Sequence, residues 1–218
     1  MLWPTICLDN FFDETNKILK FANSLEYNIS LSGKWPGKRT APLHQIDKFF
    51  FELFAKKVLS VLYPINFEEI SYNLELYFQK ISQEYINEGW IHDDHHVEFT
   101  SIVYLSDHKE CGTSFFDTKT VCASYKNIDS KIESYRNKNF IEEQNKLKEN
   151  NIQFEETVII KSKFNRLIIF DGGQLHGAKN FIDGNIKEDR LTLVGFFHNI
   201  NLSNIKYNGI QHKRIKCI

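Results

Sequence analysis

The hydrophobic pattern of this 218-residue chain changes its period near residue 70. In residues 12–27 and 46–64, apolar side chains recur three and four positions apart, as they do on one face of a helix. From residue 71 onward, apolar side chains alternate or form short β-branched runs between turn residues, which is typical of strands. Helices followed by many short strands predict a mainly β fold, in which N-terminal helices pack on a β-sandwich or jelly roll.

The two N-terminal helices have recognisable starts. Asp13 is the expected cap of the first helix, whose apolar stripe is Ile18, Leu19, Ala22 and Leu25. Asp47 is the expected cap of the second helix, which we expect to end before Pro64. Between the two helices, residues 32–42 are expected to form a loop, with a turn at Pro36 and Gly37.

The strands that we expect share β-branched or alternating apolar residues and lie at 71–82, 100–106, 112–116, 156–162, 165–172 and 190–200. A polar, charged stretch at 129–151 interrupts them and is expected to form an exposed helix or an insertion that is dispensable for folding. The sequence shows no repeat and no linker. It therefore predicts one domain over residues 1–218, with helical support at about 1–66, a β core at about 70–200 and an insertion at about 117–155.

Composition limits the partners of the chain. The formal net charge is −1, which argues against general electrostatic binding to nucleic acid or to a membrane surface. The sequence has no run of about 18 apolar residues and no signal-peptide pattern at its start. Its four cysteines are far apart and form no CxxC, which indicates free thiols and a cytoplasmic location.

Two histidines and a carboxylate stand out as metal-ligand candidates. Successive side chains of a strand point to opposite faces, so His92 and Asp94 are expected to share a face. His176 follows the Gly172-Gly173 turn after an apolar strand and is the best third ligand. Two histidines and one carboxylate form the ligand set of non-haem Fe(II) oxygenases. The neighbouring Asp93, His95 and His96 are rival ligands, and zinc bound by a mixture of these residues is an open alternative.

A charged residue begins the last apolar strand. Arg190 and Thr192 share one face of that strand, and a guanidinium binds a carboxylate in a two-pronged geometry. The phenol of Tyr104, on an earlier strand, can reach the same carboxylate. The alternatives are an ion pair of Arg190 with Glu188 or Asp189, and a buried core position for Tyr104.

The order of these segments resembles the 2-oxoglutarate/Fe(II) dioxygenase superfamily, nearest to its prolyl-hydroxylase-like branch. The resemblance covers about residues 76 to 200 and lies in WIHDD, FTSIVYLS, CGTSFF, NRLIIFDGGQLHGA and RLTLVGFF. It implies a double-stranded β-helix, or jelly roll, flanked by helices. It further implies that His92, Asp94 and His176 bind iron, and that Arg190, assisted by Tyr104, holds the distal carboxylate of 2-oxoglutarate.

The function implied is that of a non-haem Fe(II)- and 2-oxoglutarate-dependent dioxygenase, a hydroxylase of a peptidyl, prolyl-type substrate or of a small molecule. Fe(II), 2-oxoglutarate and O2 are the implied cofactor and co-substrates, and ascorbate is compatible with them. Peptidyl proline, a free amino acid, another metabolite and a nucleobase all stay open as substrates. The alternatives are a cupin-type jelly-roll metalloprotein without 2-oxoglutarate and a catalytically silent binding scaffold. The insertion at 117–155 either shapes the substrate entrance or is inert.

Overall fold

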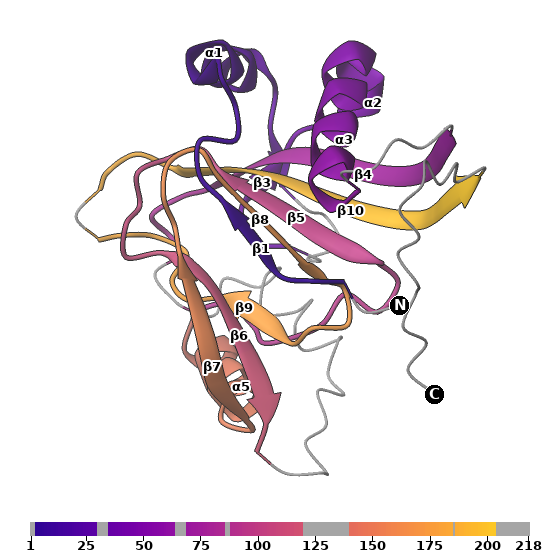
Figure 1. The fold of residues 1–218 in the computed structure, drawn as a ribbon. Coiled ribbons are helices and arrows are strands. Elements are labelled where there is room, and N and C mark those ends of the chain that lie inside the picture. The colour runs from indigo at the N-terminus through magenta and orange to yellow at the C-terminus, as the bar shows by residue number, and fades with distance from the viewer. Residues whose placement is uncertain are drawn as a thin grey trace, which may run out of the picture.

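The computed structural model describes residues 3–29, 35–63, 69–85, 88–119, 140–184 and 186–203. These residues form two sheets whose neighbouring strands are all antiparallel (Figure 1). The larger sheet has the order β1 (Ile6–Leu8), β8 (Arg166–Asp171), β5 (Phe99–Tyr104), β10 (Arg190–Ser203), β4 (Glu69–Ile81), β3 (Lys38–Arg39) and β2 (Asn28–Ile29). The smaller sheet has the order β7 (Phe154–Lys161), β6 (Gly112–Thr118) and β9 (His176–Ala178).

The larger sheet lies between a helical layer and the smaller sheet. Figure 1 shows α1 (Thr15–Ser24), α2 (Leu43–Ile46) and α3 (Lys48–Leu62) on one side of it and the smaller sheet on the other. A further helix, α5 (Phe140–Asn151), lies in the connection between β6 and β7. The expected jelly roll with flanking helices is therefore confirmed.

Helix α3 supplies much of the contact between the helical layer and the larger sheet. Asp47 caps it as expected, because its side chain accepts a hydrogen bond of 2.9 Å from the amide of Phe50. Phe50, Phe54 and Val58 recur every four residues and are all buried. The Phe50 ring stacks on Phe78 of β4, with centroids 5.9 Å apart. This packing fixes the position of β4 under the helices.

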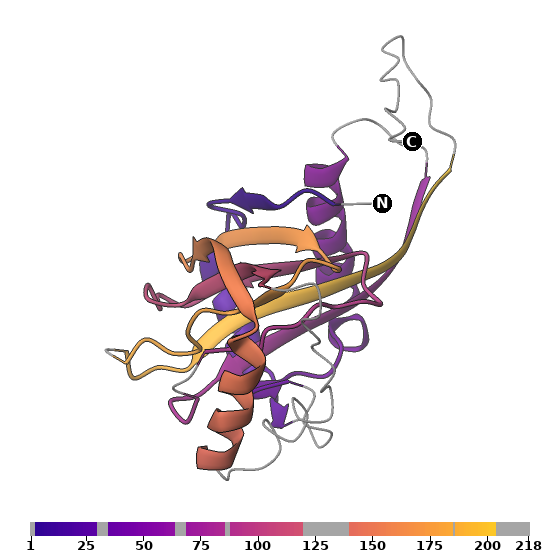
Figure 2. The same ribbon diagram turned by 90° about the horizontal axis from the view of Figure 1, so that it is seen from below.

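Strands β4 and β10 are the long central pair of the larger sheet (Figure 2). Their alternation agrees with the expected pattern. On β4, Leu74, Leu76 and Phe78 are buried in the core shared with the helices, while Gln79 lines a cavity on the opposite face. On β10, Leu193 packs in that core and Arg190 lines the cavity. The same alternation thus separates an apolar face from a face that carries polar groups.

Three expectations need correction. Asp13 does not cap α1, whose N-cap residue is Glu14. The Asp13 carboxylate instead accepts a hydrogen bond of 3.0 Å from Lys57 of α3. The segment expected to be helical support also contributes strands β1, β2 and β3. The expected insertion at 117–155 includes the end of β6 and the start of β7, and its residues 120–139 lie outside the described part of the chain.

Two further observations concern the whole chain. No helix in the described residues is long and apolar enough to cross a membrane. Cys7 and Cys111 are free thiols, whereas Cys122 and Cys217 fall outside the described residues. The organisation of residues 1–218 as one domain stays a prediction.

Candidate metal centre

His92, Asp94 and His176 lie together between the two sheets. Each offers one ligand atom, and these atoms lie within 4.8 Å of one another. The Nε2 atom of His92 is 3.8 Å from Oδ1 of Asp94, and the Nε2 atom of His176 is 3.6 Å from Oδ2. Two nitrogens therefore face the two oxygens of one carboxylate, as they would around a shared ion.

The backbone brings the two histidines together in a way that the sequence does not reveal. His92 and Asp94 do not share a continuous strand, because His92 forms an isolated bridge with His176, the first residue of β9. The amide of His92 donates to the carbonyl of His176 at 3.0 Å, and the reverse bond is 2.8 Å. The strand alternation assumed for His92 and Asp94 was thus wrong, although their side chains do face each other.

Hydrogen bonds set the tautomer of both imidazoles. Nδ1 of His92 lies 2.8 Å from the carbonyl oxygen of Trp90, and Nδ1 of His176 lies 2.8 Å from that of Gln174. A carbonyl oxygen only accepts, so each Nδ1 carries the hydrogen and donates it. The lone pair of each neutral ring is then on Nε2, the atom that faces Asp94. Carbonyl groups that orient metal-binding histidines in this way are a regular feature of metal sites.

Asp94 is held from two directions. The Thr100 hydroxyl donates to Asp94 Oδ2 at 2.8 Å, and the Asp94 amide donates to the carbonyl of Gly172 at 2.7 Å. A Cβ on Gly172 would lie 1.9 Å from the carbonyl oxygen of Val97, so only glycine allows this close approach. The Gly172-Gly173 turn therefore supports Asp94 as well as leading to His176.

The rival ligands lie outside this cluster. Asp93 pairs with His95, whose Nδ1 atom is 2.9 Å from the Asp93 carboxylate. His95 and His96 are exposed. Within the described ranges, His92, Asp94 and His176 are the one group in which three such ligand atoms converge.

The cluster opens onto a cavity of about 310 Å³. Arg190 and Thr192 of β10 line it and are both buried, at 5% and 3% exposure. Arg190 makes no ion pair with any described residue, and its buried Nε atom has no acceptor there. The alternative pairing with Glu188 or Asp189 is therefore not observed. An unpaired, buried guanidinium in a cavity is suited to an anionic ligand.

The ring of Tyr104 contacts the Arg190 guanidinium, but Tyr104 does not itself line the cavity. The Arg190 guanidinium carbon lies 5.6 Å from the centroid of the Tyr104 ring. The Tyr104 hydroxyl is 2.8 Å from the Thr113 hydroxyl, and Thr113 does line the cavity. Burial raises the pKa of Tyr104, so the phenol stays neutral and able to donate.

Several side chains that line the site were not predicted from the sequence. Thr100, Thr113, Gln79 and Arg39 all line the cavity. The position of Thr100, on the same strand face as Tyr104, was the one signal that could have marked it. The other three depend on pairing between distant strands. Trp35 and Trp90 also line the cavity.

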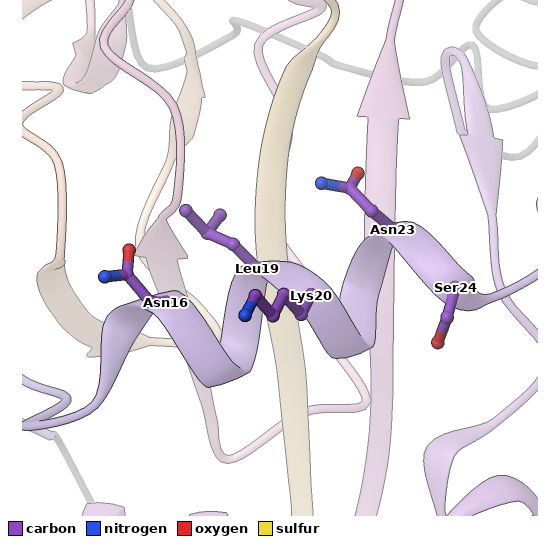
Figure 3. Close-up of a pocket in the computed structure, with 5 residues that line it drawn as sticks. All are labelled: Asn16, Leu19, Lys20, Asn23 and Ser24. Carbon is purple, nitrogen blue, oxygen red and sulfur yellow. The ribbon is translucent and has the colours of Figure 1, made fainter.

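A second hollow, of about 520 Å³, runs along α1 (Figure 3). Asn16, Leu19, Lys20, Asn23 and Ser24 line it, and all but Leu19 are exposed. It contains one cation and no carboxylate, imidazole or thiol, so the groups for metal or acid–base chemistry gather at the cavity between the sheets.

One protein-family model matches most of the chain. Residues 3–197 match the model described as "Family of unknown function (DUF6445)", and the chain therefore belongs to this family. A search of curated proteins gave no match.

Solved structures with the same fold are enzymes that use 2-oxoglutarate. One is SnoN, a non-haem α-ketoglutarate-dependent epimerase from nogalamycin biosynthesis, at a TM-score of 0.54 and 14% identity over 89% of this chain and 77% of that chain. Another is HygX from Streptomyces hygroscopicus with nickel and 2-oxoglutarate bound, at 0.53 and 11% over 89% and 82%. A third is a 2OG-Fe(II) oxygenase-family oxidoreductase from Burkholderia pseudomallei, at 0.51 and 11% over 89% and 84%. At these identities the likeness establishes a shared fold.

Proposed function

We propose that this chain is a non-haem Fe(II)- and 2-oxoglutarate-dependent oxygenase. One observation carries the proposal: two histidines, each with Nε2 toward the site, and a carboxylate converge at a cavity lined by the Arg190 guanidinium, which has no ion-pair partner among the described residues. Fold neighbours with nickel or iron and 2-oxoglutarate, as their names state, add support.

The donor set fits a ferrous ion. His92, Asp94 and His176 supply two imidazole nitrogens and a carboxylate oxygen, a set that leaves further positions of the ion open for ligands. Bound iron would supply the redox chemistry by which 2-oxoglutarate and O2 oxidise a substrate. The carbonyls of Trp90 and Gln174 orient the two imidazoles so that Nε2 of each faces the site.

The second part of the proposal concerns 2-oxoglutarate. Arg190 is proposed to bind its distal carboxylate through a two-pronged contact. Tyr104 supports the guanidinium, while Thr192 and Thr113 present hydroxyl groups to the same cavity. Because these residues are buried, they exclude water from the co-substrate and strengthen its hydrogen bonds.

The finer assignments also belong to the proposal. Hydroxylation of a peptidyl or small-molecule substrate, and membership of the prolyl-hydroxylase-like branch, rest on the resemblance of WIHDD and the strands that follow it. The organisation of residues 1–218 as one catalytic domain rests on a sequence without a repeat or a linker.

A binding experiment tests the proposal without knowledge of the substrate. Metal-free protein is titrated calorimetrically with Ni(II), which supports no turnover, and then with 2-oxoglutarate. We expect both to bind, 2-oxoglutarate only after the metal, and His176→Ala to lose both. Succinate released from 2-oxoglutarate by the Fe(II) form is the second readout. Metal binding without 2-oxoglutarate binding would favour the cupin-type alternative, and failure to bind metal would favour a silent scaffold.

A further inference from the structure

We propose that Arg39 forms a second anion site in the cavity and recognises a carboxylate of the primary substrate. This inference rests on the proposed function and makes the substrate of this site an organic acid. Arg39 lies on β3, the short strand beside β4, and lines the same cavity as the metal-ligand candidates. Nothing in the sequence pattern marks this residue.

Aromatic rings surround the Arg39 guanidinium. Its central carbon lies 4.6 Å from the ring centroid of Trp35, 5.5 Å from that of Tyr77 and 5.4 Å from that of Phe196. Ring faces attract a cation and fix its plane, and they leave the edge of a guanidinium able to bind an anion. The same rings would pack against the apolar part of a substrate.

A hydrogen-bonded amide sets the orientation of this guanidinium. Nε of Arg39 donates to Oε1 of Gln79 at 3.0 Å, and Nε2 of Gln79 donates to the carbonyl of Pro36 at 2.8 Å. The Pro36 contact thereby fixes which end of the buried amide faces Arg39. With Nε bonded in this way, the two terminal nitrogens are the donors left for a ligand.

The charge of Arg39 is not neutralised in the described part of the protein. No described residue forms an ion pair with it, and its terminal nitrogens have no acceptor there. Burial lowers the pKa of Arg39 to about 10, and the carboxylates of Asp94 and Glu75 oppose this shift. The guanidinium is therefore charged at neutral pH in a partly desolvated position, where an anion would stabilise it.

Trp35 adds a second donor beside Arg39. Its indole Nε1 is buried and has no acceptor among the described residues, although a buried indole usually finds one. The terminal nitrogens of Arg39 and the indole N–H of Trp35, which have no acceptor among the described residues, thus belong to two residues that line the same cavity. Because the Glu75 carboxylate lines the same cavity, one negative charge on the ligand matches this wall better than the two charges of a phosphate.

The guanidinium groups of Arg39 and of the proposed 2-oxoglutarate anchor, Arg190, lie against different rings. The Arg39 guanidinium lies over Phe196 of β10, 5.4 Å from the ring centroid, whereas that of Arg190 lies 5.6 Å from the ring centroid of Tyr104. By strand register the Arg39 backbone is level with Thr192, because Arg39 pairs with Gln79 and Gln79 pairs with Thr192. The Arg39 side chain therefore reaches a part of β10 six residues beyond Arg190, and the two cations occupy separate places in one cavity.

The experiment uses protein loaded with Ni(II) and saturating 2-oxoglutarate. Phenylacetate and the uncharged phenylacetamide, which differ in charge but share a ring, are titrated while tryptophan fluorescence and ligand-observed NMR are recorded. We expect phenylacetate to bind at least about tenfold more tightly. Arg39→Gln should abolish the difference and Arg39→Lys should keep part of it. Lys38→Gln, which removes an exposed charge from the same strand, should change nothing.

Each other outcome has one meaning. Equal binding of the two probes to the parent protein, no binding of either, or an unchanged preference in Arg39→Gln overturns the proposal. If Arg39→Gln weakens 2-oxoglutarate while Ni(II) still binds, Arg39 anchors the co-substrate and the proposal is likewise wrong. If the parent protein binds neither Ni(II) nor 2-oxoglutarate, the proposed function fails. The preference for phenylacetate, measured on the metal-free protein, still tests the anion site separately.

Discussion

The side-chain oxygen of Asn151 accepts a hydrogen bond of 3.1 Å from the amide of Ile91, sixty residues earlier in the chain. The same side chain donates to the carbonyl of Gly89 at 3.0 Å, and its neighbour Asn150 donates to the carbonyl of Ile91 at 3.1 Å. Ile91 immediately precedes His92. The C-terminal end of α5 therefore holds the segment that presents the first metal-ligand candidate, while the dispensability of residues 129–151 for folding stays a prediction.

Replacing Asn151 with alanine should weaken metal binding without removing a ligand. The change leaves the Ile91 amide without its acceptor, so we expect the free energy of unfolding to fall by about 1–3 kcal/mol. Because His92 is then less well positioned, the variant should bind Mn(II) roughly tenfold more weakly in calorimetric titrations. Asn145→Ala, an exposed position on the same helix, is the matched control and should match the parent protein. Equal metal affinity in both variants would mean that α5 only packs against this segment.

Thr100 is expected to matter through Asp94. Thr100→Val keeps the shape of the side chain but removes the hydroxyl that donates to Asp94 Oδ2. Loss of a hydrogen bond of this kind lowers metal affinity by about 10–100-fold in known sites, and we expect a loss in that range. Thr100→Ser keeps the donor and should retain most of the affinity. If the serine and valine variants bind Mn(II) equally well, the hydroxyl has no part in holding Asp94.

The fold was largely predictable because burial imposes a regular pattern. Strand β4 alternates between Leu74, Leu76 and Phe78 on one face and polar residues on the other, so both its existence and its faces could be inferred. The cap of α3 was predictable because Asp47 has no competing partner in the described chain. Asp13 does have one, Lys57 of α3, and no local pattern announces a contact 44 residues away.

The sequence pointed to three residues that the structure brings together, but not to the backbone geometry that does so. Strand β9 has three residues, and the bridge between His92 and His176 depends on distant segments. The closeness of His92 and Asp94 was inferred from a strand that does not exist there. Arg39 could not be found at all, because its role follows from the pairing of β3 with β4 and from rings contributed by three separate segments.

His108 should make stability depend on pH. It is fully buried, and its Nδ1 atom accepts a hydrogen bond of 3.2 Å from the amide of Asp183. Burial and, next, the charge of Arg190 lower the pKa of His108 in the folded protein. Below the unfolded value of about 6.5, the unfolded chain takes up a proton that the folded protein does not. The free energy of unfolding should therefore fall as pH decreases below about 6.5, by up to about 1.4 kcal/mol per pH unit from this residue.

His108→Asn isolates this contribution, since its side-chain oxygen can accept from Asp183 but cannot titrate. Denaturant unfolding at about pH 7.5 and about pH 5.5 should show a smaller loss of stability in the variant than in the parent protein. The same pH slope in His108→Asn and the parent would show that other groups cause it.

Replacing Arg190 should weaken ligand binding without lowering the stability of the ligand-free protein. It is 5% exposed, and no described residue forms an ion pair with it, so the described part of the ligand-free protein leaves a buried charge without a partner. Arg190→Leu should leave the stability of the ligand-free protein unchanged or raise it. Arg166→Leu removes a guanidinium that bonds Asp9 at 2.6 Å and should lower stability. The two variants thus separate a structural arginine from one held ready for a ligand.

The gain in stability on binding 2-oxoglutarate should be larger for Arg166→Leu than for Arg190→Leu. With Ni(II) present, 2-oxoglutarate at about 100 times its dissociation constant should stabilise the parent protein and Arg166→Leu by about 2.7 kcal/mol. Arg190→Leu should bind Ni(II) normally, because no ligand atom is changed, but its 2-oxoglutarate affinity should fall by roughly 2–5 kcal/mol, the usual cost of breaking a buried charge pair. Arg190→Lys should recover part of the loss, since an ammonium group provides a point charge without the two-pronged geometry. Undiminished stabilisation of Arg190→Leu by 2-oxoglutarate would place the anchor on another residue, for which Arg39 is the first candidate to test.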